Sequence, residues 1–396
     1  SAIAHTRWRK KSNGEYAQRA LPPVKFNYSE AVVGDTVQTL SPDNLENLPQ
    51  GVDGGIYRWV DLNGEGLSGV LTEQAGAWFY KANESTVTRS RVTNENGTVE
   101  NTFSAQLGQT QTVARMPAGG LGGGTKQLMD IDGNGQLDLV QLSTSTGGFF
   151  ERNPNSTWEI FLPFKQLPNI NWQDPNLKFF DLTGDGHADA VITEADVITW
   201  YPSLAKEGFD ASSSHHTATH EDDGPRVLFA DAKETIFQSD FSGDGLTDIV
   251  RIRNGEVCYW PNLGYGKFGK KIIMGNAPWF DTDDQFSPQR IRLTDVDGSG
   301  TIDIIYLGGQ QASIYFNQSG NTWSAAQVIS GYPLVDNLSA VSAVDLLGNG
   351  TACLVWSSPL PNAQGTQIRY IELMAKGKPH LLINTNNNLG AETHIQ

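Results

Sequence analysis

A nine-residue motif that recurs along the chain limits its possible folds more than any other feature. The motif reads Asp-x-(Asp/Thr/Ser)-Gly-(Asp/Asn/Ser)-Gly-x-x-Asp, and its good copies begin at Asp130, Asp181, Asp240 and Asp295. Two weaker copies begin at residues 61 and 345 and hold Gly69 and Cys353 at the ninth position. Successive copies start 50 to 69 residues apart. This regular recurrence predicts a protein built from six similar units.

The residues around each copy repeat as well. One apolar segment precedes the motif, as at 291–293, and a second follows it, as at 304–307. A third segment is aromatic, as at 259–260, and weaker fourth segments are visible at 158–161 and 323–326. Glycine, asparagine and proline separate the segments, which is typical of short strands joined by turns.

Four short strands in each unit predict the fold class. We expect an all-β protein, namely a six-bladed β-propeller of four-stranded antiparallel blades, because stacking sheets in a ring buries both faces of each sheet. Residues 36–396 are expected to form this propeller. A tandem of small β-sandwiches is the alternative, and the lack of any linker-like stretch between the units argues against it.

Residues 1–35 differ from the repeats. Residues 6–20 indicate a β-hairpin around the Asn13-Gly14 turn, and residues 21–28 indicate an extended segment. The extended segment could close the ring by pairing with residues near 381–383. Alternatively, it could belong to a neighbouring domain.

The composition excludes several classes of protein. Charged residues make up 18% and aromatic residues 10% of the chain, which is too little charge for a coiled coil and too many aromatics for a disordered chain. The formal net charge of −16 disfavours binding to nucleic acid or to an anionic membrane. No apolar run reaches the roughly 18 residues of a membrane helix, so we expect no direct membrane insertion.

Two further features bear on the cellular compartment. Cys258 and Cys353 each lie in a strand-like run, so we expect buried thiols and no disulfide framework. The chain opens at Ser1 without a visible signal peptide, and it could be a fragment of a longer protein.

The acidic motif suits a hard cation such as Ca²⁺. Side-chain oxygens at positions 1, 3 and 5, a backbone carbonyl at position 7 and a carboxylate at position 9 can surround Ca²⁺ with six or more oxygen ligands. Bound Ca²⁺ would be expected to stiffen the loop and not to activate a water molecule. The candidate ligands are Asp130, Asp132, Asn134 and Asp138; Asp181, Thr183, Asp185 and Asp189; Asp240, Ser242, Asp244 and Asp248; and Asp295, Asp297, Ser299 and Asp303.

An EF-hand is excluded, and a second interpretation of the loops stays open. An EF-hand needs flanking helices and Glu at position 12, where the copies hold Gln141, Ile192, Arg251 and Tyr306. Neutral hydroxyls at position 3 or 5 reduce the ligand charge in the last three good copies, which leaves the copy at 130 as the best candidate. The alternative is that Asp and Asn cap a tight turn with their own hydrogen bonds. We interpret the copies at 61 and 345 as turns only.

Other candidate sites are weaker. Residues 119–126 are rich in glycine, but their Thr-Lys order is the reverse of a phosphate-binding loop, so an inter-blade loop is favoured. Histidines 215, 216 and 220 beside acidic residues 221–223 favour a solvated loop over a metal site. No local pattern assembles a catalytic triad, so no catalytic residue is assigned. Aromatic residues that could stack on sugars, but whose common strand position favours the core between blades, are Trp200, Tyr201 and Trp260.

Segments within and outside the acidic loops resemble those of known protein families. The loops themselves resemble the calcium loops of FG-GAP and integrin-type propellers. Four further stretches look like parts of the B component of Tc-type (toxin complex) insecticidal toxins, namely residues 11–28, 47–73, 259–269 and 386–393. This second resemblance runs nearly end to end along the chain, and it extends to related virulence-plasmid B-type proteins.

This resemblance implies a function. In that family the B component carries a β-propeller that docks on the pentameric A component, which is the translocation channel. The remainder of the B component and the C component form a shell around a toxic enzyme, and docking opens the propeller as a gate for the unfolded cargo. The chain would then be a secreted, non-catalytic module, and we expect its weak seam near the units at 61 and 345.

Two other functions stay open. An FG-GAP-type adhesin or lectin-like propeller would bind glycans or a cell-surface protein. A propeller enzyme that cleaves polysaccharides is least favoured, because the chain is acidic and has no catalytic signature.

Overall fold

The computed structural model describes residues 1–46, 48, 57–85, 90–93, 99–102, 104–114, 120, 125–143, 146–153, 157–309, 311–331, 333, 339–358 and 366–395. Within these ranges the chain consists almost entirely of strands and turns, and α1 (Pro42–Leu45) is a single helical turn. No helix within them is long and apolar enough to cross a membrane.

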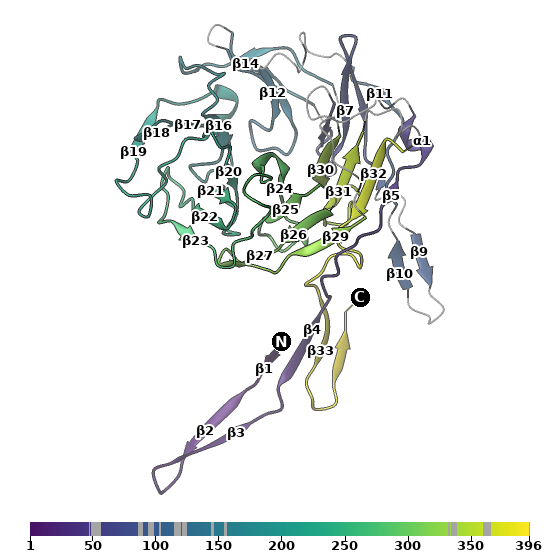
Figure 1. Cartoon of the computed structure of the whole chain (residues 1–396), viewed down its shortest axis with the longest axis vertical. Coiled ribbons are helices and arrows are strands. Elements are labelled where there is room, and N and C mark those ends of the chain that lie inside the picture. Colours follow the sequence, from purple (N-terminus) through teal and green to yellow (C-terminus); the bar gives the residue numbers. More distant parts are fainter. Residues whose placement is uncertain are drawn as a thin grey trace.

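Among the described residues, six four-stranded antiparallel sheets each contain one copy of the motif. We number them sheet 1 to sheet 6 in the order of the motifs, which join the first strand of each sheet to the second. Figure 1 shows the sheets following one another around the body of the molecule. Their strands are β6 (Tyr57–Val60), β7 (Gly69–Gln74), β8 (Ala77–Lys81) and β11 (Gln111–Thr112) in sheet 1; β12 (Lys126–Met129), β13 (Asp138–Gln141), β14 (Gly148–Phe150) and β15 (Leu162–Pro163) in sheet 2; β16 (Leu177–Phe180), β17 (Asp189–Thr193), β18 (Val197–Tyr201) and β19 (Ser213–His216) in sheet 3; β20 (Ile236–Ser239), β21 (Asp248–Arg253), β22 (Glu256–Trp260) and β23 (Ile272–Ile273) in sheet 4; β24 (Ile291–Thr294), β25 (Asp303–Leu307), β26 (Gln311–Tyr315) and β29 (Gln327–Ser330) in sheet 5; and β30 (Ala340–Val344), β31 (Cys353–Ser357), β32 (Ile368–Glu372) and β5 (Gln38–Thr39) in sheet 6.

The apolar core lies between neighbouring sheets. One cluster of buried residues joins Val191 of sheet 3 to Ile249 of sheet 4, and comparable clusters join the other consecutive pairs. A further cluster joins Val70 of sheet 1 to Val355 of sheet 6. Burying one such side chain stabilises the fold by about 1.5–3 kcal/mol. Each sheet therefore packs on both faces, the first sheet packs on the last, and the architecture is propeller-like.

Sheet 6 is completed from the opposite end of the chain. Strand β5 pairs with β32 through Thr39 opposite Arg369 and Gln38 opposite Tyr370. The Tyr370 hydroxyl donates a hydrogen bond of 2.8 Å to Gln38 Oε1. The strand that completes the last sheet is therefore residues 38–39, and not residues 21–28 as we considered from the sequence.

Residues 21–28 do pair near 381–383, but in a separate sheet. Strand β4 (Val24–Tyr28) pairs with β33 (Leu382–Asn386), with Tyr28 opposite Leu382. Strands β1 (Ala2–Ile3) and β34 (Glu392–His394) flank this pair. The hairpin of β2 (Thr6–Lys10) and β3 (Tyr16–Ala20) forms around the expected Asn-Gly turn. Figure 1 shows this sheet and hairpin projecting from the body, with both chain ends on the projection. Residues 382–394 fall within the span 36–396 that the sequence assigns to the propeller, and they pair with β4 in this separate sheet.

Two expected fourth strands lie elsewhere in sequence. The outer strands of sheets 2 and 5 are β15 and β29, which begin at the residue directly after the predicted segments at 158–161 and 323–326. Trp158 and Trp323 are buried, and Trp323 belongs to a small hairpin of β27 (Asn317–Gln318) and β28 (Thr322–Trp323). The two tryptophans pack in the apolar clusters between sheets. A second small hairpin is formed by β9 (Ser90–Thr93) and β10 (Val99–Thr102).

Candidate functional site: the aspartate loops

The first aspartate of each copy caps its own turn. Asp181 Oδ2 accepts the Gly186 amide at 2.8 Å, and its Oδ1 accepts the Gly184 amide at 2.6 Å. Gly184 and Gly186 have φ values of 81° and 87°, which L side chains rarely adopt. The turn itself therefore requires the glycines and the aspartate. The same capping is made by Asp61, Asp130, Asp240, Asp295 and Asp345.

The ninth aspartate ties the loop to the third strand of its own sheet. Asp303 Oδ2 accepts the Val296 amide at 2.9 Å, and its Oδ1 accepts the Asn317 amide at 2.8 Å. Asp189 and Asp248 make the same two bonds in their sheets. Asp138 accepts only the Arg152 amide, at 3.0 Å, and its Oδ2 has no partner among the described residues. These carboxylates are structural whether or not a cation is present.

Burial changes the acidity of the ninth aspartates. Loss of solvent raises the pKa of Asp138 and of Asp248 to about 6, although backbone amides oppose the shift. The same loss of solvent raises the pKa of Asp303 to about 8, and the nearby Asp297 and Asp295 charges add to the rise. A bound cation would favour the ionised form of these groups.

The side chains at positions 3 and 5 point partly toward the backbone. Asn134, Asp185 and Asp244 each accept the amide two residues further on, at 2.7, 3.0 and 2.9 Å. Burial raises the pKa of Asp189, and the buried Thr183 hydroxyl beside it opposes that rise. The Ser242 hydroxyl donates to Asp240 Oδ1 at 3.3 Å. In the loops at 181 and 240, many of the side-chain oxygens are therefore already hydrogen-bonded within their own turns.

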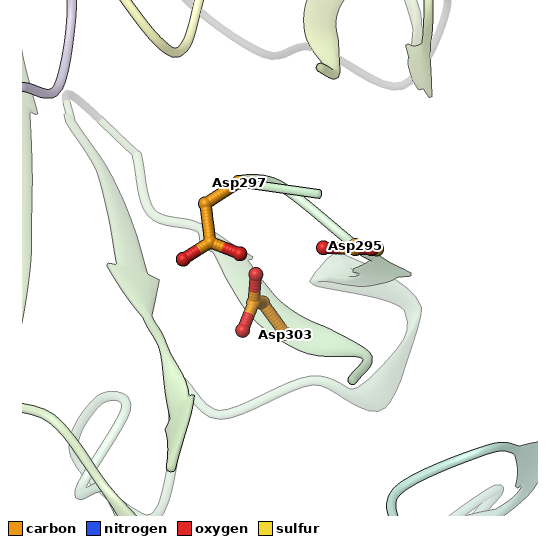
Figure 2. Close-up of side chains that lie close together, drawn as sticks. All are labelled: Asp295, Asp297 and Asp303. Atoms are coloured by element: carbon orange, nitrogen blue, oxygen red, sulfur yellow. The ribbon is translucent and has the colours of Figure 1, made fainter. Parts of the chain in front are cut away.

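The loop at 295 gathers three carboxylates. One oxygen each from Asp295, Asp297 and Asp303 lies within 4.8 Å of the others, and Figure 2 shows the Asp297 and Asp303 carboxylates facing each other. Oxygens that share a Ca²⁺ at 2.3–2.6 Å lie within about 5 Å of one another. These residues fit Ca²⁺. Nε2 of His380, from the segment after sheet 6, lies 3.0 Å from Asp297 Oδ2.

The loop at 130 contains a cationic side chain. Lys206 Nζ lies 2.7 Å from Asp132 Oδ2 and 2.9 Å from Glu151 Oε1. Both hydrogen bonds raise the pKa of Lys206. Burial alone would raise the pKa of Asp132, but the bond to Lys206 brings it below its usual value. The ammonium group already balances the charge that a calcium ion would balance here.

Side chains from one sheet also reach the motif of the previous sheet. Arg152 Nη2 donates to Asn63 Oδ1 at 3.0 Å, and Asn262 Nδ2 donates to the Asp181 carbonyl at 3.0 Å. Asn317 Nδ2 donates to the Phe241 carbonyl at 3.0 Å. Asn83 of sheet 1 donates to the Leu346 carbonyl of sheet 6 at 3.1 Å. Sequence analysis did not identify these inter-sheet contacts. A signal was present for three of them, because Arg152, Asn262 and Asn317 each follow a ninth aspartate by 14 residues.

In the degenerate loop at 61, a tyrosine occupies the place of the ninth aspartate. The Tyr80 hydroxyl accepts the Leu62 amide at 3.3 Å and donates to the Val60 carbonyl at 3.3 Å. A Cβ on Gly69 would lie 2.6 Å from this hydroxyl. Glycine therefore makes room for the tyrosine. In the loop at 345, burial raises the pKa of the Cys353 thiol to about 12, and Cys353 and Cys258 are both free and buried as expected.

The remaining candidates are placed as follows. Residues 119 and 121–124 of the glycine-rich stretch lie outside the described residues. His215 and His216 are exposed on β19, whereas Glu221 bonds to Arg251 Nη1 at 2.8 Å and also to Lys271. These two cations lower the pKa of Glu221 to about 2. Trp260 is fully buried.

No protein-family model matches the chain, and no curated protein matches it. Solved structures do match it. A chain of the Photorhabdus luminescens Tc holotoxin pore with the mutation TccC3-D651A shares 26% identity at a TM-score of 0.78, over 100% of this chain and 17% of that chain. The TcdB2-TccC3 structure shares 25% identity at a TM-score of 0.59, over 99% of this chain and 18% of that one.

A lectin gives a weaker match. An Agrocybe aegerita lectin that recognises non-reducing terminal N-acetylglucosamine shares 18% identity at a TM-score of 0.52, over 76% of this chain and 74% of that chain. At this identity the likeness concerns the fold alone. The chain thus has the fold of one segment of Tc toxin chains and spans less than a fifth of their length.

Proposed function

We propose that the chain is the β-propeller of a Tc toxin B component, that it docks on the pentameric A-component channel, and that it gates passage of the enclosed toxic cargo. The observation that carries this proposal is the full-length match to the Tc holotoxin pore chain at a TM-score of 0.78. The sequence resemblance outside the aspartate loops supports the same assignment. The proposed role is mechanical and non-catalytic.

The proposal includes a closed ring of six blades. The apolar cluster that joins Val70 to Val355 supports closure, because it places the first sheet against the last. The bond from Asn83 to the Leu346 carbonyl crosses the same seam. A ring of this kind leaves a central passage lined by one strand of each blade.

Docking can be tested directly. We expect the purified chain to bind the pentameric A component and not an unrelated β-propeller protein in a pull-down. Failure of the purified chain to bind, while a complete B component binds the same pentamer, would contradict docking through this region.

We place the gate at the seam between sheets 6 and 1. Strand β5 contributes two residue pairs to β32, and three further backbone hydrogen bonds join residues 32–40 to residues 368–375. Opening there requires this single closing segment to detach. Docking can drive this opening only if the A component binds the open form more tightly than the closed form. On addition of the A component, amide hydrogen exchange should rise around residues 32–40 and 366–374. Changes confined to residues 181–303 would contradict this placement.

A covalent lock gives a second test of the gate. Thr39 and Arg369 are direct cross-strand partners, and such pairs lie at Cα separations that suit a disulfide. The double variant Thr39→Cys with Arg369→Cys should bind the A component but block cargo release until it is reduced. Release by the oxidised variant at the rate of the reduced variant would place the gate elsewhere.

The other proposed partners are the remainder of the B component and the C-component shell, in a secreted complex. The projecting sheet and hairpin carry exposed apolar side chains that suit such a contact, including Ile3, Trp8 and Ile383. Calcium, where it binds, would stiffen the loop that joins the first strand of a blade to its second.

A further inference from the structure

A cavity of about 390 Å³ opens on the seam between sheets 3 and 4. Sheet 3 contributes Ile198, Trp200 and His215, and sheet 4 contributes the loop from Leu263 to Phe268. Gly224 and Pro225 belong to the same lining. The volume lies within the range of small-molecule sites. This cavity is separate from the aspartate-loop carboxylates and from the proposed gate.

The wall of the cavity is aromatic and closely fitted. Trp200 packs partly on the apolar cluster between the two sheets. Gly266 lies flat against its ring, because a Cβ on Gly266 would lie 2.2 Å from Trp200 Cζ2. Gly266 therefore covers part of one face of the indole and fixes the orientation of the ring at the cavity wall.

A second aromatic ring stands at the rim in an unfavourable backbone conformation. Tyr265 has a φ of 53°, and its side chain is 85% exposed. Its amide is anchored to the Thr183 carbonyl at 2.9 Å. A left-handed backbone is uncommon at a bulky residue, and this exposed ring gains nothing from burial. The ring therefore stands at the rim, where a ligand can reach it.

Several polar side chains around these rings have no hydrogen-bond partner in the described part of the chain. Among the described residues, the side chains of His215, Thr217 and Lys267 form no hydrogen bond or ion pair with one another or with the rest of the protein. Asp223 pairs with Lys270 at 3.3 Å through Oδ1 alone. The cavity therefore offers donors and acceptors together, and Lys270 offsets the charge of Asp223.

We propose that this cavity binds the terminal pyranose ring of a glycan. The C–H face of a pyranose stacks on aromatic rings, and its hydroxyls both donate and accept hydrogen bonds, which matches the rings and the mixed polar rim. Trp200 and Tyr265 would stack on the ring, and His215, Thr217 and Asp223 would bind its hydroxyls.

The test uses saturation-transfer NMR and calorimetry on the whole chain, with the methyl pyranosides of glucose, galactose, mannose and N-acetylglucosamine as probes. At least one should bind. Tyr265→Ala should weaken that binding about tenfold through loss of stacking, and His215→Ala should weaken it as well. Tyr265→Phe keeps the ring and should bind nearly as tightly as the original chain.

Tyr16→Ala is the matched control, because Tyr16 is also a largely exposed tyrosine, at 62%, but lies on the projecting hairpin. Thermal unfolding of each variant checks that the fold is intact. The proposal is overturned if none of the pyranosides binds, or if Tyr265→Ala and His215→Ala bind as the original chain does. It is also overturned if no sugar binds while Tyr265→Ala abolishes binding to the A component, because the cavity would then take a protein side chain.

Discussion

The loops at 130 and 295 share one motif but differ in how their charge is balanced. Both carry aspartate at positions 1, 3 and 9. In the loop at 130, the Lys206 ammonium binds Asp132 at 2.7 Å, whereas in the loop at 295 three carboxylates lie together. The difference arises outside the motif, because Lys206 comes from the next sheet. A calcium-like pattern therefore specifies a turn, and the neighbouring repeat decides how much negative charge the turn retains.

The largest expected difference between the two loops concerns stability. Asp303→Ala leaves the buried Val296 and Asn317 amides without their acceptor and should lower the free energy of unfolding by about 3 kcal/mol. Asp138→Ala orphans only the Arg152 amide and should cost about 1.5 kcal/mol. Urea unfolding at neutral pH measures both. Equal losses would mean that the hydrogen bonds of the ninth position do not distinguish the loops.

The second largest difference between the loops at 130 and 295 is expected in cation binding. We expect terbium to luminesce on the original chain and on Asp132→Asn, but much less on Asp297→Asn, because Asp297 belongs to the three-carboxylate group. Calcium at 100 times its dissociation constant should stabilise the chain by about 2.7 kcal/mol. EDTA provides the baseline. Strong terbium emission from Asp297→Asn would assign the bound ion to another loop.

Removing the Lys206 ammonium group should make the loops at 130 and 295 more alike in cation binding. Lys206→Met deletes the ammonium that neutralises Asp132 and Glu151, and it keeps most of the aliphatic stem. The variant should bind one more terbium ion than the original chain, more weakly than the loop at 295 does. Lys165→Met removes another lysine that is paired with a glutamate, Glu207, and serves as the control. An unchanged stoichiometry would show that Lys206 is not what excludes the ion.

The smallest effect is expected in the degenerate loop at 61. Tyr80→Phe removes the hydroxyl that accepts the Leu62 amide, so the free energy of unfolding should fall by about 1 kcal/mol. Tyr16→Phe, at an exposed tyrosine, should change it little. No loss in Tyr80→Phe would mean that the tyrosine does not replace the ninth aspartate.

The sequence predicted the local parts of this molecule well. The motif spacing predicted the repeated four-stranded sheets, and the glycines predicted the turns that Asp181 and its counterparts cap. What it did not predict depends on residues that meet across repeats. Lys206 at the loop of the previous sheet is one case, and Asn83 at the seam between sheets 6 and 1 is another.

Short strands were the other feature that the sequence did not predict. Strand β5 has two residues and no periodicity to detect. The segments at Trp158 and Trp323 carried an apolar signal, but that signal reflects packing between sheets and not strand pairing.

The pairing of residues 38–39 with 369–370 also orders events during synthesis. Strand β5 has no partner until the ribosome has made β32, about 330 residues further along the chain. Early repeats can fold as they emerge, yet sheet 6 stays incomplete until translation has nearly passed its last repeat. A messenger truncated before that point would give a chain with an unpaired sheet face at each end, exposed to aggregation and proteolysis.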